Sequence, residues 1–159
     1  MTKTTTLQVT TPSDLEIAMI RTFDAPRRLV FEAFTKPELV QRWLLGPDGW
    51  TMPVCEMDVR PGGKYRYVWR KPGKPDMATG GVFREVTPPE STVCTEKFED
   101  PWYEGESLVT TIFEEEDGRT TVTQTMLFDN KETRDGVLKS GMESGVAVSY
   151  DRLAEILAQ

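Results

Sequence analysis

The stretch from Glu132 to Gln159 constrains the fold of this chain more than any other part of the sequence. Apolar side chains recur there at steps of four or three residues, with one serine in the series, and that spacing marks a single helical face. The series consists of Leu138, Met142, Val146, Ser149, Leu153 and Ile156. Asp129 or Asn130 can cap the first turn, because both side chains accept hydrogen bonds from backbone N–H groups. The pattern predicts one long amphipathic helix.

Glycines interrupt this predicted helix at Gly136, Gly141 and Gly145. Each glycine in a helix interior costs about 1 kcal/mol relative to alanine, so helix stability is given up for space. Gly141 and Gly145 are separated by one helical turn and therefore clear the same strip of the helix surface. Two interpretations stay open. Either another backbone packs closely against the strip, or a cavity lies beneath it.

The length of 159 residues and an ordinary globular composition fit one domain with a core of its own. We expect this domain to span residues 14–159, after a polar, threonine-rich and flexible arm at residues 1–13. The formal net charge of −7 argues against nucleic-acid binding, which needs clustered Lys and Arg against phosphate. An exposed edge strand could support a weak dimer, and otherwise we expect a monomer.

No apolar run is long enough for a membrane span, and the N-terminal residues lack the apolar core of a signal peptide. We therefore expect a cytoplasmic protein. Cys55 and Cys94 are far apart and show no metal-binding spacing, so we expect two buried thiols. No metal ion or organic cofactor is indicated.

The chain has no histidine. This removes the commonest general base near neutral pH, and with it Ser-His and Cys-His pairs and zinc sites that contain histidine. Any catalysis would need a carboxylate, tyrosine, lysine or cysteine of shifted pKa. The sequence therefore favours a binding protein over an enzyme.

Between the arm and the C-terminal helix, strand patterns alternate with turn residues. A strand over residues 15–23 precedes two short helices, one starting at Asp24–Pro26 and one where Thr35 and Glu38 suggest a capping box. Further strands are expected over residues 50–59, 64–70, 78–86, 92–98, 107–114 and 120–128. Hairpin-linked strands of this kind form an antiparallel sheet, and the C-terminal helix would cover one face. The order predicts an α+β fold.

Seven short segments carry a resemblance by their order and spacing. They are RTFDAP at 21–26, FEAFTKPE at 31–38, RWLLGP at 42–47, DVRPGG at 58–63, PPE at 88–90, RDGVL at 134–138 and GM at 141–142. Together they resemble the bacterial branch of the family similar to the activator of the heat-shock protein 90 ATPase, within the START-like or SRPBCC superfamily. The resemblance runs from about residue 14 to the C-terminus.

This resemblance implies a helix-grip fold, in which a curved antiparallel sheet of about six to seven strands wraps around the long C-terminal helix. It also implies a cavity between sheet and helix, where superfamily relatives hold lipids, sterols, hormones or polyketides. The family name adds a stress-related chaperone as an alternative partner. Fold similarity alone does not identify a ligand.

The strand at Lys64–Arg70 alternates, so that Tyr65, Tyr67 and Trp69 share one face. We expect this aromatic face to point inward, where it would either line a pocket or form ordinary core. Glu96 lies in another strand, and its direction stays open. If it points inward, burial would raise its pKa and make it the best acid–base or ligand-anchoring group.

Trp43 and Trp102 lie near predicted element ends, where they could close a cavity mouth or cap the core. No residue is assigned as catalytic or metal-binding. The expected ligand-binding residues are Trp43, Tyr65, Tyr67, Trp69, Glu96, Trp102, Gly141, Met142, Gly145 and Ser149.

Three functions compete. The favoured one is a carrier or sensor that binds a small apolar or amphipathic molecule in the cavity. The second is an enzyme similar to polyketide cyclases, with Glu96 and Tyr65 or Tyr67 in the same cavity. The third is a module that binds a chaperone or another stress-related protein.

Overall fold

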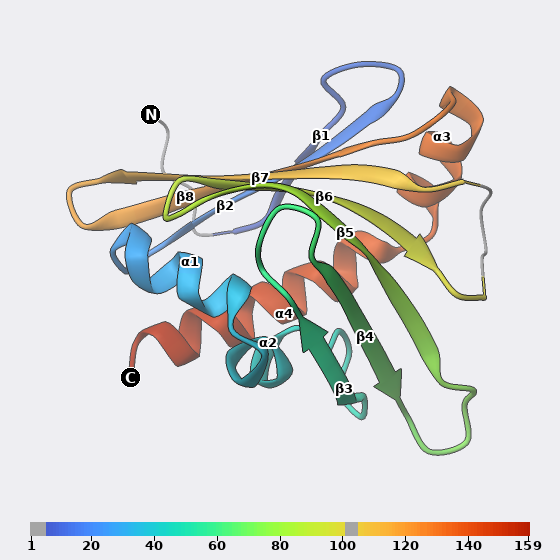
Figure 1. Cartoon of the computed structure of the whole chain (residues 1–159), viewed down its shortest axis with the longest axis horizontal. Helices are drawn as coiled ribbons and strands as arrows, with labels where there is room; N and C mark the ends of the chain where they lie inside the picture. The colour runs from blue at the N-terminus through green and yellow to red at the C-terminus, as the bar shows by residue number, and fades with distance from the viewer. Residues whose placement is uncertain (1–5, 101–104) are drawn as a thin grey trace.

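The computed structural model describes residues 6–100 and 105–159 of the chain. One antiparallel sheet of eight strands dominates it, in the order β1-β2-β8-β7-β6-β5-β4-β3 (Figure 1). The strands are β1 (Gln8–Thr10), β2 (Glu16–Phe23), β3 (Thr51–Met57), β4 (Lys64–Arg70), β5 (Met77–Thr87), β6 (Ser91–Phe98), β7 (Ser107–Glu116) and β8 (Arg119–Leu127). The helices are α1 (Arg27–Thr35), α2 (Pro37–Trp43), α3 (Lys131–Lys139) and α4 (Met142–Leu157).

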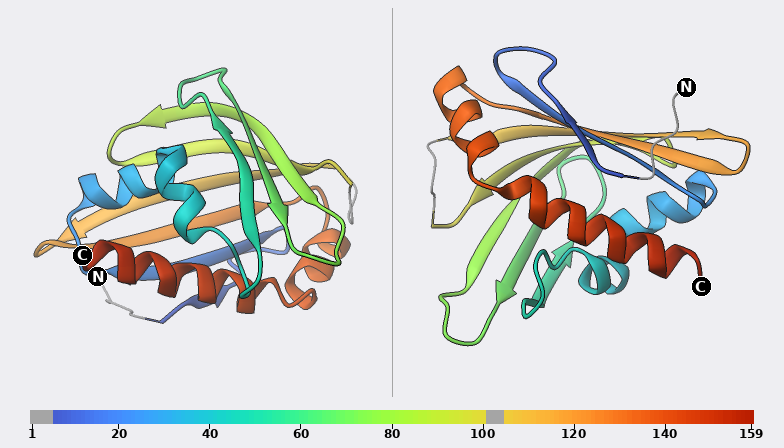
Figure 2. Two further views of the ribbon diagram at one scale, coloured as in Figure 1. Left: turned by 90° about the horizontal axis from the view of Figure 1, so that it is seen from below. Right: turned by 180° about the vertical axis from the view of Figure 1, so that it is seen from behind.

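The sheet curves around α4, and α1 and α2 lie on the same side of the sheet as α4 (Figures 1 and 2). The expected α+β arrangement of helix-grip type is therefore confirmed, with one strand more than the upper expectation. The strand that raises the number is β1, which pairs antiparallel with β2 and lies within the segment expected to be a flexible arm.

Two clusters of buried side chains fill the space between sheet and helices. The larger packs α1, α2 and the second half of α4 on the sheet, around Phe23, Trp43, Phe113, Tyr150 and Leu153. The smaller packs α3 on the sheet, and its members are Ile17, Met19, Phe128 and Val137. Leu7 and Val146, both partly buried, pack against both clusters.

Turn residues explain the hairpins. Asp117 and Gly118 join β7 to β8, and both have positive φ angles, of 54° and 75°. Two successive residues of this kind form the turn whose twist matches that of the flanking strands. The predicted hairpin at this position is confirmed, and the expected range of β4 agrees with the structure residue for residue.

The break between α1 and α2 has a different origin from the predicted capping box. Thr35 ends α1 and its hydroxyl donates to the carbonyl of Phe31, at 2.8 Å, while Lys36 is the N-cap of α2 and makes no side-chain cap. Pro37 begins α2 as predicted, because its fixed φ and missing N–H suit a first helical position. The break between the two helices therefore depends on Pro37 rather than on a capping box of Thr35 and Glu38.

The prediction of one continuous C-terminal helix is wrong. α3 ends at Lys139 and α4 begins at Met142, with Gly141 between them at φ +85°. Residues other than glycine rarely adopt this backbone conformation, so Gly141 separates two helices instead of clearing a strip within one. At the start of α3, Asn130 accepts a hydrogen bond from the Thr133 N–H at 2.8 Å, as predicted.

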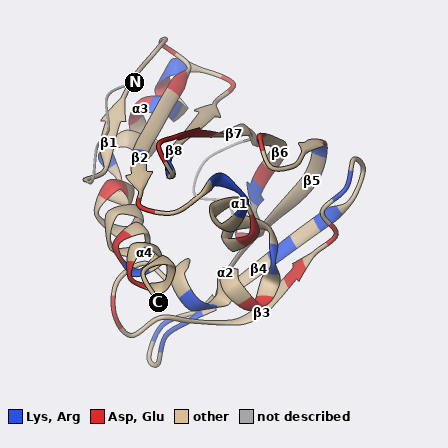
Figure 3. Ribbon diagram, turned by 90° about the vertical axis from the view of Figure 1, so that its left-hand side faces the viewer, with Lys and Arg blue, Asp and Glu red and all other residues tan. Residues whose placement is uncertain are grey.

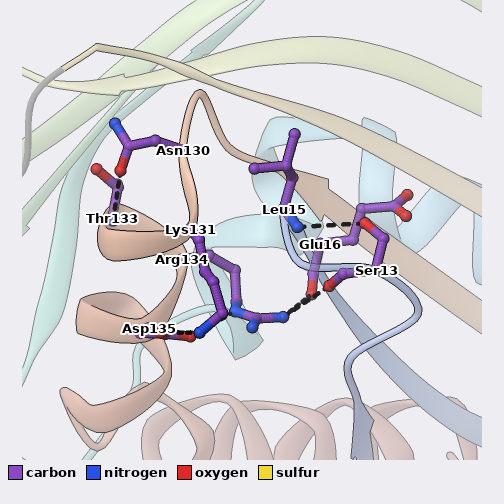
Figure 4. A network of polar contacts seen from close by, with 8 residues as sticks. All are labelled: Ser13, Leu15, Glu16, Asn130, Lys131, Thr133, Arg134 and Asp135. Carbon is purple, nitrogen blue, oxygen red and sulfur yellow. Dashed lines mark hydrogen bonds and ion pairs between the residues drawn. The ribbon is translucent and has the colours of Figure 1, made fainter.

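Arg134 fastens the start of α3 to the start of β2 (Figure 4). Its side chain is buried, and Nη1 donates to the carbonyls of Ser13, at 2.7 Å, and Glu16, at 3.2 Å. Nε donates to the Asp135 carboxylate at 2.8 Å. The Arg134 guanidinium thus links α3, which follows the last strand, to the start of β2, and it has a structural role.

Charged residues of both signs are spread over the strands, turns and helices (Figure 3). β7 ends in Glu114, Glu115 and Glu116, all exposed, while Lys64, Arg66 and Arg70 lie exposed along β4. Within the described residues, no helix has both the length and the apolar character that crossing a membrane requires.

Candidate functional site: a cavity between the sheet and the helices

A cavity of about 520 Å³ lies between the two core clusters. Trp43 and Tyr150 of the larger cluster and Met19 and Val137 of the smaller cluster all contribute to its wall. The sheet supplies side chains from seven strands, β2 to β8, and the rest come from α1, α2, α3, α4 and the segment from Leu44 to Trp50. The volume falls in the range of pockets that hold small organic molecules.

The aromatic face of β4 lines this cavity. Tyr65, Tyr67 and Trp69 all contribute to the wall, so the inward direction predicted from their alternation is confirmed. The ring centroids of Tyr65 and Tyr67 are 5.1 Å apart, and those of Tyr67 and Trp69 are 5.8 Å apart. These spacings are typical of tilted and edge-to-face aromatic pairs. The three rings therefore form one continuous aromatic surface.

Hydrogen bonds hold the polar atoms of this surface. The Tyr65 hydroxyl donates to the carbonyl of Thr95 at 2.7 Å, and Trp69 Nε1 donates to the carbonyl of Leu44 at 2.7 Å. The Tyr67 hydroxyl has a weaker contact, 4.0 Å from Met57 Sδ. Backbone acceptors thus fix the side chains of Tyr65 and Trp69 and already engage their polar atoms.

Gly80 and Gly81 on β5 lie too close to the backbone of the neighbouring strands to carry side chains. An added Cβ at Gly81 would clash with the backbone carbonyl of Thr95, and one at Gly80 would clash with the backbone carbonyl of Tyr65. With no side chain at Gly81, which pairs with Tyr65, the phenol ring reaches across β5 to Thr95 on β6. This pair was not predicted from the sequence. Adjacent glycines inside a strand pattern were the available signal, because they mark close backbone approach.

Glu96 points inward. It lies on β6 and lines the cavity together with Thr92, Cys94 and Phe98. Among the described residues its carboxyl group has no hydrogen-bond or ion-pair partner. Burial raises the pKa of this group from its ordinary value of 4.5 to about 7. The direction that the sequence left open is therefore settled, and Glu96 is the anionic group of the cavity wall.

Cys94 lies beside Tyr65, with Sγ 3.9 Å from the phenol oxygen. Burial raises the pKa of the Cys94 thiol to about 12 and that of Cys55 to about 11. Both cysteines are free thiols, as predicted, and a thiol with a raised pKa is a poor nucleophile at neutral pH. Among the described residues, no group of three His, Cys, Asp or Glu side chains could hold a metal ion.

The helical side of the cavity includes Met142, Gly145 and Ser149 on α4. Gly145 lies inside the helix, and an added Cβ would meet only Cδ of Pro47, at 3.7 Å, which is an ordinary contact. Gly141 does not line the cavity, because its place is the break between α3 and α4. The structure therefore does not place Gly141 in the wall that we expected it to line, and its backbone conformation explains why glycine occupies the position.

Ser149 and Trp43 line the cavity but already have structural contacts. Ser149 Oγ accepts a hydrogen bond from the Gly46 N–H at 2.9 Å, and Trp43 Nε1 donates to the carbonyl of Ala33 at 2.8 Å. Trp43 is 2% exposed and belongs to the larger core cluster. Trp102 lies outside the described residues.

The segment from Leu44 to Trp50 is a part of the wall that sequence reasoning missed. Arg152 on α4 donates to the carbonyls of Trp43, at 3.1 Å, and Gly46, at 3.3 Å, so that α4 holds this segment in place. The contact joins residues more than a hundred positions apart, and no local pattern signals it. The cavity wall therefore depends on the docking of α4.

Comparison with known proteins identifies the family to which this fold belongs. Residues 24–158 match the family model described as Activator of Hsp90 ATPase homolog 1-like protein. The chain belongs to this family. The resemblance identified from the sequence segments is confirmed, although a search of curated proteins found no match.

Solved structures share the fold of this family member over almost all of the chain. A crystal structure of a Rhodobacter sphaeroides protein has 27% identity and a TM-score of 0.91, covering 96% of this chain and 98% of that one. A solution structure of a Staphylococcus epidermidis protein has 26% identity and a TM-score of 0.81, covering 96% and 94%. A Mycobacterium smegmatis protein, at 24% identity and a TM-score of 0.81 over 94% and 97%, shows the common fold alone.

Proposed function

We propose that this member of the family is a carrier or sensor that binds a small apolar or amphipathic molecule between the sheet and the helices. The observation that carries the proposal is the cavity of about 520 Å³ with its wall of mainly aromatic and aliphatic side chains. A few polar groups, among them Glu96 and Gln124, interrupt this wall. Pockets of this size and composition bind drug-sized ligands, with the polar groups fixing their orientation.

Gly145 provides the test. An added Cβ there meets only Pro47 Cδ, and because Gly145 lines the cavity we expect a leucine in its place to fill part of it. Gly136 is the matched control, because it lies inside α3, is exposed, and has nothing within 4 Å of an added Cβ. Both substitutions improve helix propensity by a similar amount, so they differ mainly in their effect on the cavity.

The first experiment is a titration with N-phenyl-1-naphthylamine, a neutral apolar dye that fluoresces in apolar surroundings. We expect saturable binding to the wild type and to Gly136→Leu, and a loss of at least about tenfold in affinity for Gly145→Leu. Val109→Phe, which narrows the cavity from β7, is the second cavity-filling variant. Circular dichroism checks that each variant is folded. Equal dye affinity in all folded variants, or no binding to the wild type, would contradict the proposal.

Native mass spectrometry of protein purified from cells, before and after organic extraction, then identifies the natural ligand. We expect an extractable mass of about a few hundred daltons, the size that such a cavity accommodates. The same mass should be lost from Gly145→Leu and retained by Gly136→Leu.

A catalyst similar to polyketide cyclases is the second candidate, and one observation favours it. Glu96 has a pKa of about 7 inside the cavity, which is the range of an effective general acid or base at neutral pH. Tyr65 is unsuited to act as a base, because burial, followed by the charges of Cys94 and Glu96, raises its pKa far above the usual value. Turnover of a polyketide-like substrate that survives Glu96→Gln would remove this candidate.

A chaperone partner, which the family name suggests, draws less support from the described surface. The exposed large hydrophobic residues come from different parts of the chain, and of these Ile112 and Leu127 share one face of the adjacent strands β7 and β8. The full set is Leu15, Leu29, Met77, Ile112, Leu127 and Val148. Protein-binding patches are usually contiguous. The cavity therefore carries the proposal.

A further inference from the structure

The described wall of the cavity contains one acidic side chain and no basic one. Within the described part of the chain, Glu96 is the only Asp or Glu of the wall, and no Lys or Arg lines it. The remaining polar wall is made of hydroxyl, thiol and amide groups, such as those of Thr92, Cys94 and Gln124. An anionic ligand would lose its hydration here without meeting a compensating positive charge.

The aromatic surface of β4 reinforces this selection. The Tyr65 hydroxyl and Trp69 Nε1 donate to backbone carbonyls, so these two donors are already engaged and do not serve a carboxylate or phosphate. The rings of Tyr65, Tyr67 and Trp69 all line the cavity and pack against one another. The face of an aromatic ring carries negative charge density and attracts an ammonium group.

Glu96 and the aromatic surface belong to the same region of the cavity. Tyr65 crosses β5 and bonds the carbonyl of Thr95, the residue directly before Glu96 on β6. After burial, the charges of neighbouring groups that include Glu96 raise the pKa values of Tyr65 and Tyr67, which reflects the proximity of the carboxyl to both phenols. A carboxyl group and several ring faces together form the arrangement that binds organic cations.

We infer that the ligand is an apolar amine, bound as an organic cation with its ammonium group between Glu96 and the rings of Tyr65, Tyr67 and Trp69. This inference rests on the proposed function, because it concerns the same cavity. The ammonium group would supply the partner that Glu96 lacks among the described residues, and would stabilise its ionised form. The apolar body of the ligand would lie against Met126, Val109 and Val146.

Three probes that share one skeleton test the chemistry: 4-phenylbutylamine, 4-phenylbutanol and 4-phenylbutanoate. We expect isothermal titration at neutral pH to show the amine binding at least about tenfold more tightly than the alcohol, and the carboxylate binding weakest. Glu96→Gln should reduce amine affinity about tenfold or more and leave the alcohol affinity nearly unchanged. Glu114→Gln, at an exposed position on β7, is the matched control and should bind like the wild type.

Tyr67→Leu provides a second variant that retains the carboxyl group and removes one ring face. It should weaken the amine more than the alcohol, and circular dichroism shows whether each variant is folded. Carboxylate affinity equal to or above that of the amine, or an amine preference that survives Glu96→Gln, would overturn the inference and leave the proposed function standing. If none of the three probes and no neutral dye binds, the proposed function itself fails.

Discussion

At the scale of single residues, the carboxyl group of Glu96 lowers the stability of the folded protein at a position where a ligand could bind. It is held in an apolar wall on β6 with no partner among the described residues, and burial raises its pKa to about 7. A buried carboxyl destabilises the folded state whenever it is ionised. Residues whose environment costs stability in this way are common at binding sites, where a ligand provides the missing partner.

Stability should depend on pH through this group. In the unfolded chain Glu96 has its ordinary pKa of 4.5, and in the folded protein about 7. Between these values the folded state binds more protons than the unfolded state, so the free energy of unfolding falls as pH rises. The full destabilisation of the folded state by ionised Glu96, about 3 kcal/mol, is present above pH 7 and absent below pH 4.5. Tyr65, Tyr67 and Cys94 face Glu96 and stay protonated throughout, because their pKa values are also raised.

Glu96→Gln should therefore be more stable than the wild type at pH 8, and the difference should vanish near pH 4. Urea unfolding at a series of pH values measures it, with Glu114→Gln as the exposed control that keeps the wild-type profile. A Glu96→Gln profile parallel to that of the wild type would show that the carboxyl group is solvated in the folded state.

At the scale of elements, Gly141 divides the C-terminal region. Its positive φ lets α3 pack on β2 and α4 cross the inner side of the sheet in a different direction (Figure 2). Arg134 on α3 and Arg152 on α4 each bond backbone carbonyls of separate parts of the chain. The two helices thus hold different regions, and the glycine between them sets their relative direction.

Alanine substitutions at two helix-region glycines should have opposite effects. Gly141→Ala forces alanine into a left-handed conformation and should lower the free energy of unfolding by about 1–2 kcal/mol. Gly136→Ala lies inside α3 with open space around it and should raise that free energy by up to about 1 kcal/mol. Urea denaturation of both variants measures the difference. Changes of the same sign would mean that Gly141 has no special backbone role.

Local patterns explain what the sequence could and could not predict at this scale. The face of β4 and the Asp117–Gly118 hairpin were predictable because alternation and turn chemistry act over a few residues. The break at Gly141 was missed because a glycine in a helical pattern is compatible both with close packing and with a positive φ. The wall segment around Gly46 was missed because its position depends on Ser149 and Arg152, far along the chain.

At the scale of the whole molecule, both edges of the sheet are poorly suited to pairing with another sheet. β1 has only three residues, and β3 carries an exposed proline, Pro53, within an irregularity of its pairing with β4. Short edge strands, prolines and bulges are the usual means of preventing association through sheet edges. The weak dimer considered from the sequence therefore draws no support from these edges.

We expect the protein to be monomeric over a wide range of concentrations. Sedimentation velocity should show a single species with the mass of one chain, 18.0 kDa, whose sedimentation coefficient does not rise with protein concentration. A reversible shift toward twice that mass would indicate a different surface for association. Repeating the run with a bound amine would show whether the ligand changes the oligomeric state.

The glycine pair on β5 limits how the binding specificity of this scaffold can be redesigned. Side chains facing the cavity from β6, β8 and α4 can be varied in a combinatorial library, because each occupies its own part of the wall. Gly80 and Gly81 cannot, since any side chain there would collide with the backbone of a neighbouring strand. A library that randomises both glycines would lose most of its folded members, whereas one that keeps them could explore new ligands around an unchanged Tyr65.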